Sequence, residues 1–176
     1  MGDHRELIVD IDISAARLES ASVELDELLE ATGWIDRSIT VTDWLYPNHV
    51  ALALGQTVRS PFSRPERDSL VILAARGVYG VGDGTTDPAC PSCGSLLSTD
   101  IADTILAAWW DGDERVAPCA DCGLRAHVGE WNLLDSVAIG ELAVAVATDT
   151  PEVADALAEH LAATTGRRWV RTHLHL

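Results

Sequence analysis

The chain has 176 residues, of which 47% are hydrophobic and 23% charged, and its formal net charge is −16 at pH 7. These proportions exclude a wholly disordered chain, and the length favours a single domain that can carry a small inserted module. A strong negative charge repels phosphate backbones, so the composition argues against general nucleic-acid binding and favours a partner with a basic surface.

The N-terminal segment gives no signal for export or membrane insertion. Residues 1–6 are charged and lack the apolar core of a secretory signal peptide. No apolar run approaches the roughly 18 residues that a membrane span requires. We therefore expect a cytoplasmic protein that does not associate with membranes.

The first predicted elements are a strand and a helix. Apolar and polar side chains alternate over residues 6–13 with the period of a half-buried strand, which places Asp10 and Asp12 on a solvated face. A helix should follow, with a serine within residues 20–22 as its N-cap and Gly33 at its end.

The middle of the chain contains extended segments and one helix. Residues 37–60 favour strands on either side of a turn at 46–48. The apolar run within residues 66–81 is compatible with a buried strand or a helix, and the pattern leaves both open. Residues 100–110 carry an apolar stripe that predicts a helix.

The C-terminal third predicts a strand, a helix and a second strand. Residues 142–148 form an apolar strand, after which Thr150 caps a helix that has Pro151 at its first position and ends at Gly166. The closing strand covers residues 169–176 and alternates again. One of its faces carries three polar side chains that could contact a partner: Arg171, His173 and His175.

Two Cys-x-x-Cys-Gly motifs flank the predicted central helix. Two cysteines separated by two residues can direct both sulfurs at one ion, and the following glycine permits the positive φ that turns the chain back and aims N–H groups at the thiolates. Four thiolates form the tetrahedral cage that structural zinc prefers. The predicted ligands of one zinc ion are Cys90, Cys93, Cys119 and Cys122.

This pattern resembles the zinc-ribbon class, whose two knuckles each carry Cys-x-x-Cys-Gly. The resemblance covers residues 90–123, and the predicted helix between the knuckles differs from the many ribbons that contain only β-structure. We expect a single α+β domain over residues 1–176, built as a two-layer sandwich, with a zinc-ribbon insertion at residues 88–128.

Other uses of the four cysteines remain open at the sequence level. The same thiolates could hold iron, form two disulfides or act as a redox pair, and His127 could replace one cysteine as a ligand. Four thiolates leave no open coordination position, which favours a structural metal. Arg125 and His127 lie close enough in sequence to offset the negative charge of a zinc–tetrathiolate centre.

A second resemblance concerns the first predicted strand. Its end, Asp10-Ile11-Asp12, resembles the first motif of the haloacid dehalogenase-like phosphatases, and residues 82–87 resemble their late Gly-Asp-Gly-x-x-Asp motif. The resemblance implies a Mg²⁺-dependent phosphatase with Asp10 as nucleophile, Asp12 as acid/base, and Asp83 and Asp87 as metal ligands. The chain contains no lysine to neutralise a phosphate.

Two adjacent tryptophans mark a further candidate for partner binding. Trp109 and Trp110 lie about 100° apart on the predicted helix, so both cannot face the same core line. An exposed tryptophan is a candidate docking anchor.

The sequence favours a non-catalytic function. It contains neither a nucleophile elbow nor a phosphate-cradling loop. Our first hypothesis is an acidic protein-binding module stabilised by zinc, such as an inhibitor or immunity protein that faces a basic toxin, or an adaptor subunit of a complex. The second is nucleic-acid binding through the ribbon, with Arg125, His127 and the basic residues 167–171 on phosphate. The phosphatase is the third.

Overall fold

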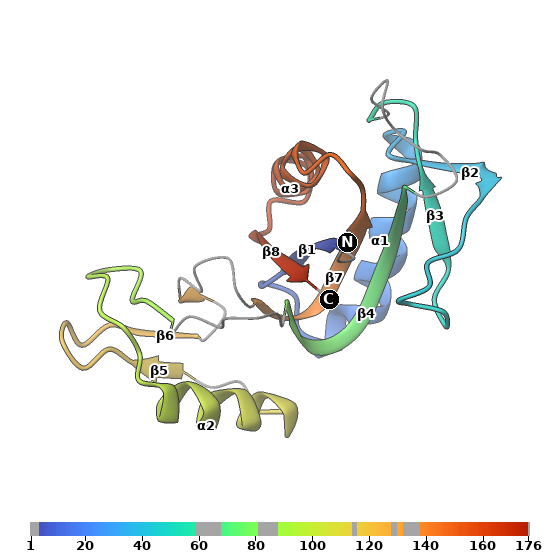
Figure 1. Cartoon of the computed structure of the whole chain (residues 1–176). Coiled ribbons are helices and arrows are strands. Elements are labelled where there is room, and N and C mark those ends of the chain that lie inside the picture. Colours follow the sequence, from blue (N-terminus) through green and yellow to red (C-terminus); the bar gives the residue numbers. More distant parts are fainter. Residues whose placement is uncertain are drawn as a thin grey trace.

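The computed structural model describes residues 4–58, 68–80, 88–113, 116–127, 130–131 and 138–175. Its centre is a six-stranded sheet in the order β2-β3-β4-β7-β1-β8, in which each strand runs antiparallel to its neighbours (Figure 1). The strands are β1 (His4–Asp10), β2 (Ile35–Thr40), β3 (Ala51–Leu54), β4 (Ser69–Tyr79), β7 (Ala138–Ala147) and β8 (Trp169–His175).

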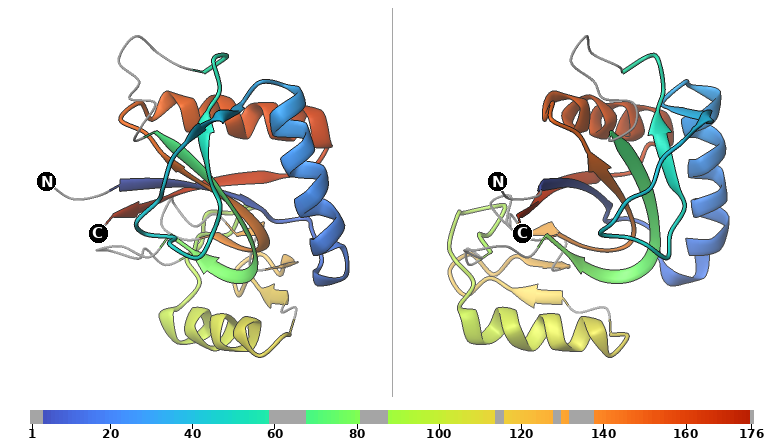
Figure 2. Two further views of the ribbon diagram at one scale, coloured as in Figure 1. Left: turned by 90° about the vertical axis from the view of Figure 1, so that its right-hand side faces the viewer. Right: turned by 45° about the vertical axis from the view of Figure 1, so that its right-hand side comes forward.

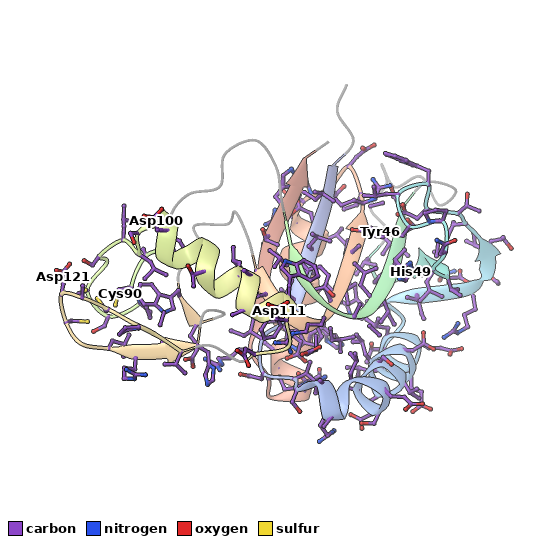
Figure 3. All side chains as sticks on the ribbon, turned by 90° about the horizontal axis from the view of Figure 1, so that it is seen from below. Tyr46, His49, Cys90, Asp100, Asp111 and Asp121 are labelled. Atoms are coloured by element: carbon purple, nitrogen blue, oxygen red, sulfur yellow. The ribbon has the colours of Figure 1, made fainter. Side chains whose placement is uncertain are left out.

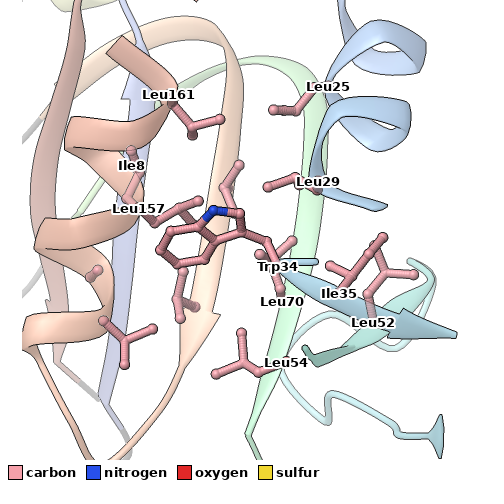
Figure 4. Close-up of a cluster of buried hydrophobic side chains, with 14 of the residues drawn as sticks. Ile8, Leu25, Leu29, Trp34, Ile35, Leu52, Leu54, Leu70, Leu157 and Leu161 are labelled. Atoms are coloured by element: carbon pink, nitrogen blue, oxygen red, sulfur yellow. The ribbon is translucent and has the colours of Figure 1, made fainter. Parts of the chain in front are cut away.

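Two helices cover one face of this sheet. Helix α1 (Leu18–Ala31) follows a short 3-10 turn (Ala15–Arg17), and α3 (Glu152–Thr165) connects β7 to β8 (Figure 2). Leucines from both helices converge on Trp34, which is 5% exposed (Figure 4). The α+β fold predicted from the sequence is therefore confirmed, with helices forming one layer and the sheet the other.

The opposite face of the sheet is also apolar and has its own core. Leu7, Val9 and Val71 are buried there, and the segment between β2 and β3 contributes Tyr46. The same segment supplies a buried ion pair, in which the Arg5 guanidinium donates two hydrogen bonds of 3.1 Å to the carboxylate of Asp43. Both faces of β1 and β7 are thus covered.

A second, smaller unit lies beside one end of the sheet (Figure 1). It follows β4 in the chain, precedes β7, and consists of α2 (Thr99–Trp110) and the hairpin of β5 (Val116–Pro118) and β6 (Arg125–His127). Its buried cluster includes Trp131 and reaches Ile139 at the start of β7, so its core continues into the sheet. We refer to residues 88–127 as the cysteine module.

The first strand differs from its prediction in one respect. Asp10 is fully buried rather than solvated, because β1 is paired on both edges and its even-numbered face, which carries Ile8, lies under the helix layer. Alternation over residues 6–13 indicated one buried face, but the even-numbered positions Glu6 and Ile8 are buried as well. Asp12 lies beyond the strand and is exposed, as predicted.

Several helix and strand boundaries also differ from expectation. The serine N-cap of the first helix was wrong: the helix begins at Leu18, and Ser20 and Ser22 lie inside it with their hydroxyls donating to backbone carbonyls three residues earlier. Thr150 does not cap α3, because Pro151 occupies the N-cap position. Gly33 and Gly166 follow the ends of their helices, as predicted, and both have positive φ.

The structure resolves the ambiguous segment in the middle region. Residues 69–79 form the long strand β4, so the strand interpretation of residues 66–81 is correct and the helix interpretation is wrong. Residues 60–65, directly before this segment, lie outside the described residues. Within the described part of the chain, no helix is both long and apolar enough to cross a membrane.

Candidate metal centre

The four cysteines converge at the end of the cysteine module that lies farther from the sheet (Figure 3). Their Sγ atoms all lie within 4.8 Å of one another. Two of the sulfur–sulfur distances are 3.7 Å, for Cys90 and Cys122, and 3.6 Å, for Cys93 and Cys119. A tetrahedral site with Zn–S bonds of about 2.3 Å places its sulfurs roughly 3.8 Å apart. The residues present therefore fit one metal ion.

The two Cys-x-x-Cys-Gly segments fold in the same way. In the first, the Cys90 N–H donates to the Ser95 carbonyl over 2.7 Å, and the Gly94 N–H donates to the Cys90 carbonyl over 2.9 Å. In the second, the Cys119 N–H donates to the Leu124 carbonyl over 2.7 Å, and Gly123 donates to Cys119 over 3.0 Å. This repetition identifies each segment as a complete knuckle.

Glycine is required at the turn of each knuckle. The φ angles of Gly94 and Gly123 are 76° and 74°, a region that side chains with a Cβ rarely adopt. A Cβ at either position would meet no other atom within 4 Å, so backbone conformation alone selects glycine here. The positive φ predicted from the sequence is confirmed.

Neighbouring backbone elements hold the knuckles together. An isolated bridge between Ala89 and Leu96 flanks the first knuckle, and the hairpin of β5 and β6 flanks the second. The Ser95 hydroxyl donates to the Asp121 carboxylate and joins the two knuckles directly. Helix α2 connects them in sequence, so the predicted helical segment between the cysteine pairs is confirmed.

The electrostatics of the four sulfurs favour a bound cation. Hydrogen bonds from the backbone N–H groups of Cys122 and Asp121 lower the pKa of Cys119 to about 7, although burial opposes them. The Ser95 N–H alone would lower the pKa of Cys93, but desolvation and the three neighbouring thiols raise that pKa to about 12. Four sulfurs this close cannot all ionise without a cation, and a bound dication would favour all four thiolates.

Two of the alternatives for these cysteines, disulfides and His127 as a ligand, find no support in the geometry. All four are free thiols, and sulfur separations of 3.6–3.7 Å are far longer than the roughly 2.05 Å of a disulfide. His127 does not join the cluster; its backbone N–H donates to the Glu130 carboxylate over 2.9 Å. The position of Arg125 and His127 on β6 leaves both exposed.

The cysteine module is attached to the sheet by a side chain that the sequence analysis did not identify. Arg76, at a register shift in β4, places its guanidinium carbon 3.5 Å from the centre of the Trp109 ring. Its Nε donates to the Trp109 carbonyl over 2.6 Å, and its Nη2 donates to the Asp113 carbonyl over 3.1 Å. Its third nitrogen pairs with Glu141 on β7, and the Trp109 Nε1 donates to the Gly77 carbonyl over 3.1 Å.

The two adjacent tryptophans face different surroundings, as their spacing predicted. Trp109 is half-buried in the junction with the sheet, whereas the Trp110 side chain is 60% exposed. Asp111, directly after Trp110, is exposed as well.

On the closing strand, two of the three polar side chains predicted to contact a partner instead bind acidic residues of the same chain. They lie on the side of the sheet that carries α3, where Glu6 binds both Arg171 (Nε–Oε2, 2.8 Å) and His173 (Nδ1–Oε1, 2.8 Å). Arg171 also pairs with Asp155 of α3. These hydrogen bonds hold the pKa of Arg171 above its ordinary value. The side chain of His175 lies outside what the structure describes.

The aspartates of the phosphatase-like motif have structural partners. The Asp10 Oδ1 accepts hydrogen bonds from the backbone N–H groups of Asp12 and Ile13, and its Oδ2 lies 3.0 Å from Arg167 Nη1. Burial raises the pKa of Asp10 despite these contacts. Asp12 is bound by Arg168, whose backbone N–H and Nε donate over 2.7 and 2.8 Å.

The sheet around these aspartates also differs from that of the phosphatases. In that family the motif ends a strand of a parallel sheet, whereas both neighbours of β1 are antiparallel to it. Asp83 and Asp87 fall outside the described residues. The phosphatase resemblance therefore does not extend to the fold.

Comparison with known proteins finds no relative of this chain. No protein-family model, no curated protein and no solved structure matches this chain. What the chain does must therefore be argued from its own residues.

Proposed function

We propose that this chain is a non-catalytic protein-binding module, stabilised by one structural zinc ion, whose partner presents a basic surface. The observation that carries the proposal is how the chain uses its arginines. Seven of the eight arginines in the described part of the chain form ion pairs with acidic side chains of the same chain: Arg5, Arg17, Arg37, Arg76, Arg167, Arg168 and Arg171.

This internal pairing favours a basic partner over a nucleic acid. The chain has 28 acidic residues and 12 basic ones, so its carboxylates outnumber the cations of the same chain that could neutralise them. Phosphate binding needs cations that face outward. The three arginines of the C-terminal basic cluster instead bind Asp10, Asp12 and Glu6.

The charge of the cysteine module supports the same proposal. Residues 88–127 contain two arginines and six acidic residues, a difference of −4, and a zinc–tetrathiolate centre adds −2. Zinc ribbons that contact nucleic acid need a positive surface, which this composition does not supply. An acidic module suits the basic surface of a protein.

Zinc is the metal that best fits a closed cage of four thiolates. Soft sulfur ligands in a tetrahedron select zinc or iron, and a four-thiolate site with no open position is typical of structural zinc. The metal then holds the module together and takes no part in a reaction. Two protein classes are consistent with these properties: an inhibitor or immunity protein for a basic toxin such as a nuclease, and an adaptor in a larger assembly.

The test is purification of the untagged protein from its own host, followed by native mass spectrometry at low and at high salt. We expect a stoichiometric complex with a basic protein that dissociates as salt increases, because charge contributes to the association. Co-purification with nucleic acid in place of protein would contradict the proposal. So would turnover of a substrate by the purified chain.

A further inference from the structure

Helix α2 ends in two adjacent tryptophans, one covered by an arginine and the other exposed. Trp109 is covered by Arg76, whose guanidinium carbon lies 3.5 Å from its ring centre while the same group pairs with Glu141. This inner site shows how the chain itself binds an arginine: a ring face for the guanidinium plane and a carboxylate for its charge.

The outer indole offers the same two features to a partner. Trp110 is 60% exposed, and the adjacent Asp111 is an exposed carboxylate. Both stand at the C-terminal end of a 12-residue helix, where the helix dipole attracts cations, and the last turn of α2 contains no basic residue. An exposed tryptophan beside negative charge is well suited to an arginine side chain.

We propose that Trp110 and Asp111 form the docking site for an arginine of the basic partner, with the guanidinium stacked on the Trp110 indole and paired with the Asp111 carboxylate. This inference rests on the proposed function and narrows it to one surface and one recognised side chain. Arginine is favoured over lysine because its planar guanidinium can stack and form directed hydrogen bonds at the same time.

The chain offers a matched alternative surface that lacks the second feature. Trp44, between β2 and β3, is 59% exposed, but the guanidinium carbon of Arg5 already lies 6.0 Å from the centre of the Trp44 ring. The nearest acidic residue in sequence, Asp43, is buried and bound to Arg5. Trp44 therefore serves as the control for stacking on an exposed indole without a free carboxylate beside it.

The test is a low-salt NMR titration of the zinc-loaded full chain with a synthetic peptide of alternating arginine and serine. A peptide with citrulline in place of arginine keeps the shape and removes the charge. We expect the Trp110 indole N–H resonance, assigned with Trp110→Ala, to shift with the arginine peptide and not with the citrulline peptide. Trp110→Ala should weaken binding by about five- to thirtyfold, the range for losing a stacked cation and its contact area.

Two further variants separate the site from general charge attraction. Asp111→Asn should weaken binding by about threefold or more, whereas Asp100→Asn, at the other end of α2 (Figure 3), and Trp44→Ala should each change it by less than about twofold. Equal losses in Trp44→Ala and Trp110→Ala would overturn the inference. So would the absence of any Trp110 shift in the wild type.

The outcome can be distinguished from failure of the proposed function. A basic protein that co-purifies equally with wild type and with Trp110→Ala would leave the proposed function in place and contradict only this docking site. The absence of any protein partner would contradict the proposed function itself.

Discussion

Arg76 of β4 forms an ion pair with Glu141 of β7 inside the central sheet, and the same guanidinium holds the end of helix α2 in the cysteine module. The Glu141 side chain is 2% exposed and that of Arg76 is 20% exposed, so the pair is largely removed from water. The remaining guanidinium nitrogens bind the carbonyls of Trp109 and Asp113 at the end of α2. One side chain of β4 thus satisfies a buried carboxylate and caps the helix of the neighbouring unit.

Replacement of Arg76 by methionine should lower the free energy of unfolding by about 3 kcal/mol, because it leaves the Glu141 charge buried without its partner. Urea denaturation measures this difference. Arg37→Met is the control, since Arg37 forms exposed ion pairs with Asp26 and Glu30 and should contribute less than about 1 kcal/mol. Equal effects of the two variants would show that the junction does not depend on this pair.

Alanine at Gly94 or Gly123 should weaken metal binding without creating a steric clash. The positive φ of each position costs a residue with a Cβ about 1–2 kcal/mol, which corresponds to roughly five- to thirtyfold lower zinc affinity. Competition with a chromophoric chelator gives the affinity. Ser92→Ala, an exposed position of the first knuckle, should leave it unchanged. Wild-type affinity in both glycine variants would show that the knuckles do not require these turns.

Loss of one ligand should unfold the module and spare the sheet. Cys119→Ser removes a buried sulfur from the module core, whereas the described residues that form the core between the sheet and helices α1 and α3 include none from the cysteine module. Hydrogen exchange read by mass spectrometry should show lost protection in the β5–β6 hairpin and unchanged protection in β1 and β7. Exchange that accelerates equally in both units would indicate one cooperative fold that depends on the metal.

Asp43 should make stability depend on pH in the acidic range. Burial alone would raise the pKa of Asp43, but hydrogen bonds from Arg5, the Leu45 N–H and Ser69 hold it below the ordinary 3.8. The unfolded chain therefore binds the proton more readily than the folded chain does. The contribution of Asp43 to stability is present above pH 3.8 and is lost as pH falls through the lower folded pKa.

The variant Asp43→Asn isolates this effect. Denaturation at several pH values should show that the stability advantage of wild type over Asp43→Asn shrinks as the solution is acidified below about pH 4. Because metal release at low pH affects both proteins, it cancels in the difference. A difference that stays constant from neutral pH to pH 2 would contradict the lowered pKa.

The clustering of the four cysteines could be predicted from sequence because its signal is local. Two cysteines three positions apart, each pair followed by a glycine, impose their geometry on a few residues, and Gly94 and Gly123 adopt the required φ. The helices could be predicted for the same reason, because an apolar stripe and a terminating glycine such as Gly166 are patterns of residues close together in sequence. Local patterns fix local structure wherever the surroundings agree with them.

The features that were missed depend on residues far apart in the chain. Alternation in β1 indicated one buried face, but Asp10 is buried because β1 pairs with β7 and β8, more than 130 positions later, and because the helices cover its even-numbered face. Arg76 gives no sequence signal, because its partners Trp109 and Glu141 are 33 and 65 residues away. Sheet order decides such contacts, and periodicity carries no information on it.

Cys90, Cys93, Cys119 and Cys122 lie close enough together to hold one metal ion, and we propose that this ion is zinc. Native mass spectrometry of the untagged protein, purified without added metal, tests it most directly by giving the metal, its stoichiometry and the oxidation state of the thiols together. We predict one zinc per chain, with all four cysteines free of disulfides and the metal lost in Cys119→Ser. A metal-free chain with two disulfides would contradict the claim.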